Sequence, residues 1–357
     1  MWITSDLAKA LTPTTVALGN FDGLHRGHRQ VVQPILNLGS VSNSLPIPQP
    51  ELAATLEIDE ARKLKLWNQD LKPSPRRIQR ENQQFFSTVV TFNPHPQEFF
   101  SGKQKKLLAP SEEKLSLLQK MGVEQVILLA FDRDLAALTP TEFVEEILVR
   151  QLQARRVSVG WDFRFGRKRT GEAKDLQAIA AKYGIDVTIV PLYTCENGER
   201  ISSSIIRQAL EEGDLNKSNR LLGRPYSLVG QVIKGQQLGR TIGFPTANIQ
   251  LPPEKFLPCF GVYAVEVYIT DRNKPLEIFV NDRRLLGVMN IGCRPTVDGQ
   301  HPTVEVYLLD WSGDLYGQTL TINLIEFIRP EQKFASLDLL KAKIQEDCLV
   351  ARSILTK

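Results

Sequence analysis

The stretch "TTVALGNFDGLHRGHRQVVQPILNLG", residues 14–39, joins two different hydrophobic patterns. Its first part, "TTVALGNF", is a short apolar run, which is typical of a buried strand. After a glycine-rich turn, Val31, Val32, Ile35 and Leu36 recur at the spacing of one helix face. A buried strand that leads through a turn into a helix predicts the first unit of a parallel α/β sheet.

The same alternation continues as far as about residue 212. Apolar runs at 85–92, 124–131, 155–163 and 185–193 alternate with helical patterns at 110–122, 139–152, 172–184 and 203–213. The helix expected at 110–122 has an acidic first turn, Lys120 near its end and Gly122 just beyond it, which are common start and stop signals. These residues predict a Rossmann-like, doubly wound parallel sheet.

The pattern changes beyond residue 222. The runs "GVYAVEVYI" (261–269), "TVEVYLLD" (303–310) and "TLTINLIEF" (319–327) alternate with period two, which predicts a small antiparallel β-barrel. A terminal amphipathic helix is expected to present Leu337, Leu340, Ile344 and Cys348 on one face. We therefore expect one domain over 1–212, a linker over 213–222 and a second domain over 223–357.

Residues 37–84 interrupt the first domain. This stretch is rich in proline and polar residues and has weak periodicity, so it predicts an exposed insertion with one possible helix around 51–67.

Composition narrows the class of protein. A net charge of +4 over 357 residues, without a dense Lys/Arg stripe, does not favour a nucleic-acid partner. The longest apolar runs have the length of strands and the N-terminus has no leader-like apolar core, so we expect neither a membrane span nor a signal peptide. The four cysteines lie far apart and form no C-x-x-C pair, which favours a cytoplasmic protein without disulfides.

The turn at 19–28, "GNFDGLHRGH", is the first candidate site. It lies where a parallel strand ends and a helix begins, the position at which α/β sheets bind ligands and helix N-termini bind phosphate. Gly23 and Gly27 would let a phosphate approach the backbone, and His25 and His28, three residues apart, could donate to the same phosphates. Two other interpretations are an exposed turn and a zinc site, although H-x-x-H lacks the spacing of H-E-x-x-H.

Four motifs occur in order along the first half: "GNFDGLHRGH", "TFNPHP" (91–96), "GWDFRFG" (160–166) and "ISSSIIR" (201–207). With these motifs, the first half resembles the adenylyltransferase half of the bacterial bifunctional riboflavin kinase/FAD synthetase family. The resemblance implies magnesium-bound ATP at Gly19, Phe21, Asp22, His25, Gly27, His28, Asp162, Ser202, Ser203 and Arg207. It implies flavin at Phe92, Asn93, Pro94 and Pro96. Ser202 and Ser203 would cap the last helix of the domain, and Arg207, one turn further on, would reach back to the leaving phosphates.

The stretch "GRTIGFPTANI" (239–249) is the second candidate site. If residues 246–248 are extended, Thr246 and Asn248 point to the same side and offer neutral oxygen ligands for magnesium. In the strand at 303–310, Val304, Val306 and Leu308 should face the core, which leaves Glu305 free to face a substrate. A β-turn with polar side chains and a solvated glutamate are the alternative interpretations.

Four motifs occur in order along the second half: "GRPYSLVGQVIKG" (223–235), "GRTIGFPTANI", "GVMNIGCRPT" (287–296) and "VEVYLLDWSGDLYG" (304–317). With these motifs, the second half resembles the riboflavin kinase barrel of the same family. The resemblance implies Mg²⁺ and ATP at Thr246 and Asn248, Glu305 as the catalytic base, and a nucleotide loop at Gly235, Gly239, Gly243 and Pro245. Ser204, Trp311 and Ser312 depart from the family pattern, and the 37–84 stretch is longer than usual.

Together these resemblances predict a bifunctional enzyme that uses ATP, riboflavin and FMN as its small-molecule partners. The barrel would phosphorylate riboflavin to FMN, and the Rossmann-like domain would adenylylate FMN to FAD. The alternatives are an enzyme with one active half, a non-catalytic flavin or nucleotide sensor, and a nucleotidyltransferase for another acceptor.

Overall fold

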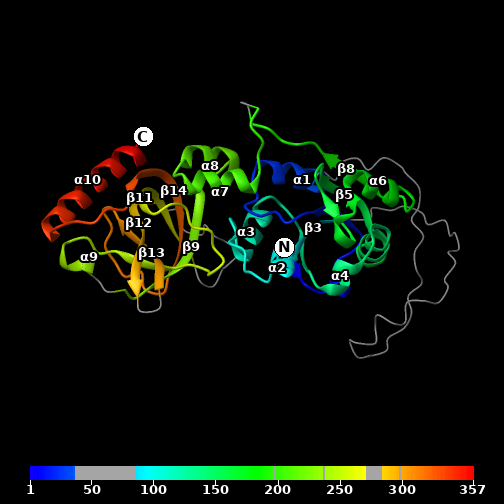
Figure 1. Cartoon of the computed structure of the whole chain (residues 1–357), viewed down its shortest axis with the longest axis horizontal. Coiled ribbons are helices and arrows are strands. Elements are labelled where there is room, and N and C mark those ends of the chain that lie inside the picture. The colour runs from blue at the N-terminus through cyan, green and yellow to red at the C-terminus, as the bar shows by residue number, and fades with distance from the viewer. Residues whose placement is uncertain (37–84, 196–197, 236–237, 271–283, 297–298) are drawn as a thin grey trace.

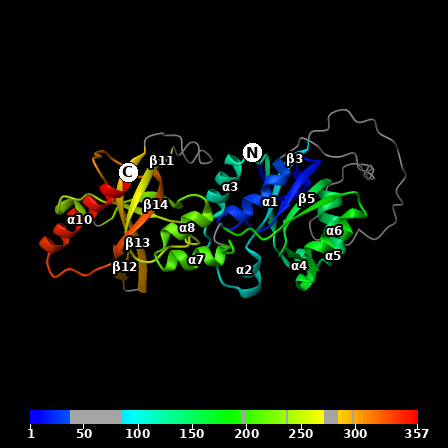
Figure 2. The ribbon, with the colours of Figure 1, turned by 90° about the horizontal axis from the view of Figure 1, so that it is seen from above.

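The computed structural model describes residues 1–36, 85–195, 198–235, 238–270, 284–296 and 299–357. The expected insertion at 37–84, with its possible helix, lies outside the described residues. In Figures 1 and 2 the described chain forms a sheet half and a barrel half that lie side by side, with α7 and α8 between them.

The first half contains the predicted parallel sheet. Its six strands lie in the order β1-β4-β3-β2-β5-β8, and every pairing between them is parallel. Their bounds are β1 Trp2–Thr4, β2 Thr14–Leu18, β3 Phe86–Asn93, β4 Gln125–Ala130, β5 Ala154–Gly160 and β8 Asp186–Val190. The apolar run at 14–18 is β2, one of the two middle strands, and all five of its residues are buried.

Helices cover both faces of this sheet. One face packs on a cluster that includes Val32 and Ile35 of α1, and the other on a cluster that includes Leu148 and Leu176. The helical elements are η1 Leu7–Lys9, α1 Arg26–Leu36, α2 Pro96–Ser101, α3 Ser111–Lys120, α4 Arg133–Ala137, α5 Pro140–Phe143, the π-helix η2 Val144–Gln151, η3 Arg167–Arg169, α6 Ala173–Ala181 and α7 Ser203–Glu211. A two-stranded hairpin, β6 Arg164–Phe165 and β7 Gly171–Glu172, follows β5. The doubly wound prediction is confirmed.

The second half is the predicted barrel. Its strands close in the order β10-β13-β12-β11-β14-β9, and all the pairings are antiparallel. The bounds are β9 Tyr226–Ile233, α9 Leu238–Thr241, β10 Ala247–Gln250, β11 Gly261–Thr270, β12 Leu285–Thr296, β13 Gly299–Leu308 and β14 Thr319–Pro330.

The terminal helix α10, Leu337–Leu355, lies on the outside of the barrel, as Figure 1 shows. Its buried residues are Asp347, Ala351 and Leu355, so its C-terminal half carries the packing. The expectation that Leu337 belongs to the apolar contact face is wrong, because this first-turn side chain is 68% exposed. Helical periodicity marks one face of a helix, but it does not show how far the partner surface extends along the axis.

One of the hydrophobic clusters spans both halves. The helix α8, Leu215–Leu222, occupies most of the segment at 213–222 that was expected to link the domains. Leu210 of α7 and Leu221 of α8 belong to the same buried cluster as the barrel residues Tyr263 and Ile291. Leu108, from the segment before α3, belongs to it as well, so the sheet half and the barrel half are packed against each other.

Candidate active sites

The turn after β2 has an unusual backbone. Phe21 and Leu24 have φ values of 50° and 41°, and Gly23 has a φ of 81°. Left-handed conformations cost energy in residues with a Cβ, and they persist where surrounding contacts fix them. A Cβ at Gly23 would also lie 3.0 Å from the Leu108 side chain, so glycine is required there both by conformation and by space.

The buried Asp22 side chain connects this turn to two other segments. Its carboxylate accepts hydrogen bonds from the backbone N–H groups of Leu108, at 2.8 Å, and Ala109, at 3.3 Å, and it forms an ion pair with Arg207. Asp22 is 3% exposed, and these donors occupy its oxygens. Phe21 is buried as well, and its ring meets the edge of His28 at a centroid distance of 5.5 Å. A Cβ on Gly19 would lie 3.2 Å from the same Phe21 ring, so these residues form the packed base of the turn.

The two histidines of the turn stack on each other. Their ring centroids are 3.6 Å apart and their planes differ by 14°. Gly27 permits this arrangement, since a Cβ there would lie 3.3 Å from the His25 ring. The backbone N–H of His28 donates to Nδ1 of His25 at 3.2 Å, so neutral His25 carries its proton on Nε2. Burial lowers the pKa of His25 to about 4, although nearby Asp22 raises it.

His28 has a similar environment. Burial lowers its pKa well below the usual value, and the neighbouring His25 and Lys114 lower it further. Its Nδ1 is buried and has no hydrogen-bond partner among the described residues. Both rings are therefore neutral near pH 7 and can act as hydrogen-bond donors rather than as cations.

The last helix of the domain meets this turn. Ser202 is the N-cap of α7, and its side chain accepts a hydrogen bond from the Ile205 N–H. The Ser203 hydroxyl donates to the Asp22 carbonyl at 2.9 Å. Arg207 reaches back to the Ser203 carbonyl and to Asp22, as its place one turn inside the helix predicts. Ser202, Ser203 and Arg207 thus lie beside "GNFDG" in space although 180 residues separate them in sequence.

Two lysines belong to this region but were not singled out from the sequence. Lys114 of α3 is 8% exposed; its ammonium donates to the Asn20 carbonyl at 2.9 Å, and burial lowers its pKa. Lys105 is partly buried, and its electrostatic neighbours are Arg207, Asp22 and Glu98. The sequence pattern around Lys114 indicates a helix with an acidic first turn, and a lone lysine inside such a pattern carries no signal for burial.

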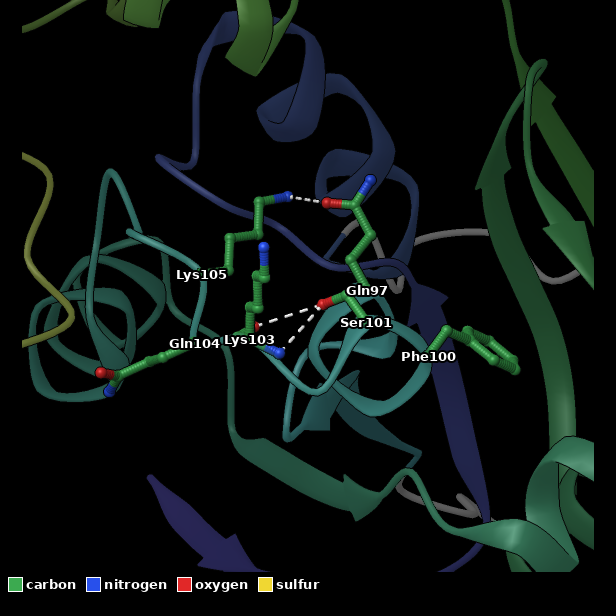
Figure 3. A pocket seen from close by; sticks show the side chains of 6 residues that line it. All are labelled: Gln97, Phe100, Ser101, Lys103, Gln104 and Lys105. Atoms are coloured by element: carbon green, nitrogen blue, oxygen red, sulfur yellow. Dashed lines mark hydrogen bonds between the residues drawn. The ribbon is translucent and has the colours of Figure 1, made fainter.

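The segment expected to contact flavin lies at the end of β3. Phe92 packs against Phe131 with ring centroids 5.6 Å apart, while Asn93 and Pro94 are exposed. Pro96 begins α2, whose N-cap is His95. Next to this segment is a hollow of about 530 Å³ lined by Gln97, Phe100, Ser101, Lys103, Gln104 and Lys105. Figure 3 shows the contact of Lys105 with the Gln97 side chain, 2.6 Å long, at this hollow.

Asp162 is the predicted site residue that follows β5. It is exposed and forms an ion pair with Arg200 at 2.9 Å, in the turn after β5. A Cβ on Gly160 would lie 3.3 Å from its carboxylate.

The barrel brings its predicted site residues together. The Thr246 hydroxyl donates to the Glu305 carboxylate at 3.1 Å, although 59 residues separate the two. Asn248 of β10 is directly opposite Glu305 of β13, and directly paired residues of antiparallel strands share a face. Val304 and Val306 are buried and Glu305 is only partly buried, which confirms the predicted alternation.

The glycines around this site differ in how much space a side chain would have. A Cβ at Gly235 would overlap the Asn248 amide, and one at Gly239 would overlap the Phe244 carbonyl and lie 3.3 Å from the Thr246 hydroxyl. Gly243 has a φ of 91° with open space around it, and Pro245, two residues on, is exposed.

Sequence reasoning did not single out Asn290. It lies on β12 directly opposite Glu305, on the other side from Asn248, so that two amides flank the carboxylate across three strands. Its only sequence signal is a polar residue inside the apolar run "GVMNIG", and the strand register that aligns it with Glu305 is a tertiary property.

Comparison with known protein families assigns each half separately. The riboflavin kinase family model matches residues 222–355, and the FAD synthetase family model matches residues 7–47 and 75–205.

Among the described residues there is no group of three or more His, Cys, Asp or Glu side chains placed to hold a metal ion. No helix in the described ranges has both the length and the apolar character needed to cross a membrane.

Similar proteins cover almost the whole chain. The bifunctional riboflavin kinase/FMN adenylyltransferase of Escherichia coli K12 is 39% identical over 94% of this chain and 91% of its own length. The protein of the same name from Haemophilus influenzae is 36% identical over 97% and 95%. A crystal structure titled as a macrolide-efflux protein from Streptococcus pneumoniae matches 98% of both chains with a TM-score of 0.74 and 27% identity. By both family models and by these relatives, the chain belongs to the bifunctional riboflavin kinase/FMN adenylyltransferase family.

Proposed function

We propose that this protein makes FAD from riboflavin in two ATP-dependent steps. The barrel half phosphorylates riboflavin to FMN, and the sheet half adenylylates FMN to FAD with release of pyrophosphate. The observation that carries this proposal is that two family models match two adjacent parts of one chain, each with its own polar cluster. Its small-molecule partners are therefore riboflavin, FMN and ATP.

Adenylyl transfer needs no enzyme nucleophile. An oxygen of the FMN phosphate attacks the α-phosphorus of ATP, and pyrophosphate leaves, so the protein must align the groups and stabilise negative charge. His25 Nε2–H is a neutral donor for this purpose, and the half-buried His28 provides a second ring beside it. The N-terminus of α7, with Ser202, Ser203 and Arg207, would hold the leaving phosphates.

The remaining residues of the adenylyl site have supporting roles in this proposal. Asp22 and Phe21 are buried under the turn, so we assign them to fixing Arg207 and His28, with Gly19 giving the Phe21 ring room. The backbone at Gly27 lies beside the histidines and would approach the phosphates. Phe92, Asn93, Pro94 and Pro96 would contact the flavin, and Asp162 would contact the nucleotide or flavin from the turn after β5.

In the barrel, the terminal hydroxyl of riboflavin attacks the γ-phosphorus of ATP and ADP leaves. Glu305 would accept the hydroxyl proton, as a carboxylate does in phosphoryl transfer. The loop with Gly235, Gly239, Gly243 and Pro245 would hold the nucleotide beside Thr246 and Asn248. We assign Asn290 to orienting Glu305, because it is paired with that residue across β12 and β13.

The barrel residues fit a magnesium ion delivered with ATP. Thr246 and Asn248 offer neutral oxygen atoms, and the Glu305 carboxylate lies 3.1 Å from the Thr246 hydroxyl. Hard oxygen donors in small number suit Mg²⁺, which keeps much of its coordination from water and phosphate. When bound, the ion would neutralise charge on the ATP phosphates. Thr246 and Asn248 would hold it, and Glu305 would remain available to the hydroxyl.

We propose a cytoplasmic location. The described cysteines, Cys195, Cys259, Cys293 and Cys348, are all free thiols, which suits a reducing compartment. For the domain bounds we propose 1–212 and 223–357, joined through 213–222.

The test is to incubate the pure protein with riboflavin and Mg-ATP and to separate the flavins by chromatography. FMN should appear first and FAD should follow. A second reaction starts from FMN and Mg-ATP and should give FAD and pyrophosphate. If only one of the two products ever forms, one half is inactive; if neither forms, the proposed function is wrong.

A further inference from the structure

The barrel half reaches into the turn that carries the two histidines. Arg224, two residues before β9, donates from Nη2 to the carbonyl of Gly23 at 2.8 Å. Gly23 lies between Asp22 and His25 and has a left-handed backbone. A guanidinium outside the proposed adenylyl half therefore fixes the centre of this turn.

A second contact reaches the same turn through the segment before α3. The segment 253–256 of the barrel half pairs with 106–108 of the sheet half: the Leu107 N–H donates to the Glu254 carbonyl at 2.6 Å, and the Phe256 N–H donates to the Leu107 carbonyl at 2.9 Å. The Lys255 ammonium donates to the Leu108 carbonyl at 2.8 Å. The N–H groups of Leu108 and the next residue hold the Asp22 carboxylate, so this segment supports Asp22 indirectly.

Charge reinforces this second contact. The Lys255 ammonium lies 2.6 Å from the Glu113 carboxylate of α3, and their side chains are 1% and 6% exposed. Burial raises the pKa of Glu113, while Lys255 and Arg224 lower it. The Arg224 Nε is buried without a partner among the described residues. One acid of the sheet half and two cations of the barrel half thus form a buried cluster at their junction.

The contacts also extend to the arginine of the proposed site. The ring of Phe256 lies under the Arg207 guanidinium, 5.6 Å from its centre. Arg207 also donates to the Lys106 carbonyl at 3.2 Å, within the segment that pairs with the barrel. Asp22 and Arg207 are therefore both held by main chain that the barrel half anchors.

We propose that Arg224 and Lys255 of the kinase half are positioning residues for adenylyl transfer in the other half. They fix the main chain at Gly23 and Leu108, and this main chain determines the positions of the Asp22, Arg207 and His25 side chains. The inference rests on the proposed function, because it concerns the rate of FAD formation. The two halves therefore have separate active sites, but residues of the kinase half support the structure of the adenylyl site.

The test measures both activities in full-length variants. Arg224→Met removes the donor to Gly23, and a misplacement of about 1 Å can cost about 100-fold in rate. We expect kcat/KM for ATP in FAD formation from FMN to fall at least about tenfold, with kinase kcat/KM within about twofold of the parent. Arg224→Lys, which keeps the charge and a donor, should recover part of the loss.

Lys255 needs a double variant, because removing one partner leaves a buried charge unpaired. Glu113→Leu/Lys255→Met replaces the pair with apolar side chains, which buried sites often tolerate, and it removes the donor to Leu108. We expect the same selective loss of adenylyl transfer at an unchanged thermal midpoint. Arg329→Met/Asp347→Leu is the matched control: it removes another ion pair, 2.7 Å apart and largely shielded from solvent, between β14 and α10, and should leave FAD formation unchanged.

Two results would overturn the proposal. One is that Arg224→Met and the Glu113/Lys255 double variant both keep adenylyl kcat/KM within about twofold of the parent. The other is that both activities fall in proportion to the folded fraction, which would mean that these residues only stabilise the folded protein. If the parent itself makes no FAD from FMN, the proposed function fails instead, so the two failures are distinguishable.

Discussion

The imidazole rings of His25 and His28 lie face to face, with their centroids 3.6 Å apart. The backbone N–H of His28 donates to Nδ1 of His25 at 3.2 Å. This arrangement fixes the tautomer of His25, because a ring nitrogen that accepts a hydrogen bond leaves the proton on the other nitrogen. Neutral His25 therefore carries its N–H on Nε2.

Replacing His28 should separate the two activities. His28→Ala removes one pre-positioned donor from the adenylyl site, and the loss of such a donor typically costs about 2.7–4 kcal/mol, or about 10²–10³ in rate. FAD formation from FMN should fall by that amount and FMN formation should stay near the parent rate in the same preparation. An equal loss of both activities would contradict this assignment.

The carboxylate of Glu305 should matter only for the kinase. Glu305→Gln keeps the size of the side chain but removes the proton acceptor, and general-base catalysis typically contributes about 10²–10⁴-fold. FMN formation should fall within that range, while FAD formation from supplied FMN is unaffected. The matched control is Glu326→Gln on β14, an exposed glutamate of the same barrel. FMN output within a few-fold of the parent in Glu305→Gln would show that this residue is not the base.

The backbone at Gly235 should control the affinity of the kinase for Mg-ATP. An added Cβ there would overlap the Asn248 amide, so Gly235→Ala must displace that side chain. Losing one polar contact of about 1.4 kcal/mol corresponds to about a tenfold rise in KM for ATP.

The control for this substitution is Gly102→Ala, which has no atom within 4 Å of the added Cβ and a φ of 65°. That variant carries backbone strain in the sheet half and should leave the kinase KM unchanged. If both variants have the parent KM, Asn248 does not contact the nucleotide or its metal.

Acid should weaken the fold through His25. Its pKa is about 4 in the folded protein and about 6.5 in an unfolded chain, so the unfolded state binds more protons between these values. The free energy of unfolding should therefore fall as the pH is lowered from 6.5 towards 4. For this one residue the loss between pH 7 and pH 5 is about 2 kcal/mol.

Urea unfolding at pH 7 and pH 5 measures this loss in the parent and in His25→Asn. Asparagine does not titrate, and its side-chain oxygen can accept the His28 N–H. The variant should lose about 2 kcal/mol less than the parent between the two pH values. Equal losses in both proteins would mean that His25 titrates normally in the folded state.

Much of the fold follows from local pattern. The runs of apolar residues separated by helical periodicity predicted the parallel sheet, and the alternation around Glu305 predicted which side of β13 is buried. Helix caps were equally readable: Ser202 caps α7 and Gly122 follows α3 with a left-handed backbone. These features depend on residues a few positions apart, which is the range over which a sequence pattern acts.

The relation between the halves could not be read in this way. Lys255 and Glu113 meet across 142 residues, and Arg224 meets Gly23 across 201. Each of these residues alone resembles an ordinary surface charge, since lysine, arginine and glutamate are mostly exposed in proteins. The exposed Leu337, expected on the contact face of α10, illustrates the same limit.

The sequence by itself determined the two fold classes, the order of the motifs and the residue types at each site, because periodicity, turn chemistry and motif spacing are local. Tertiary structure alone decided the stacking of His25 on His28, the pairing of Thr246 with Glu305, and the buried charges that join the halves. Burial and strand register depend on which distant segments pack together. This packing forms only when the whole chain folds and buries its apolar surface away from water.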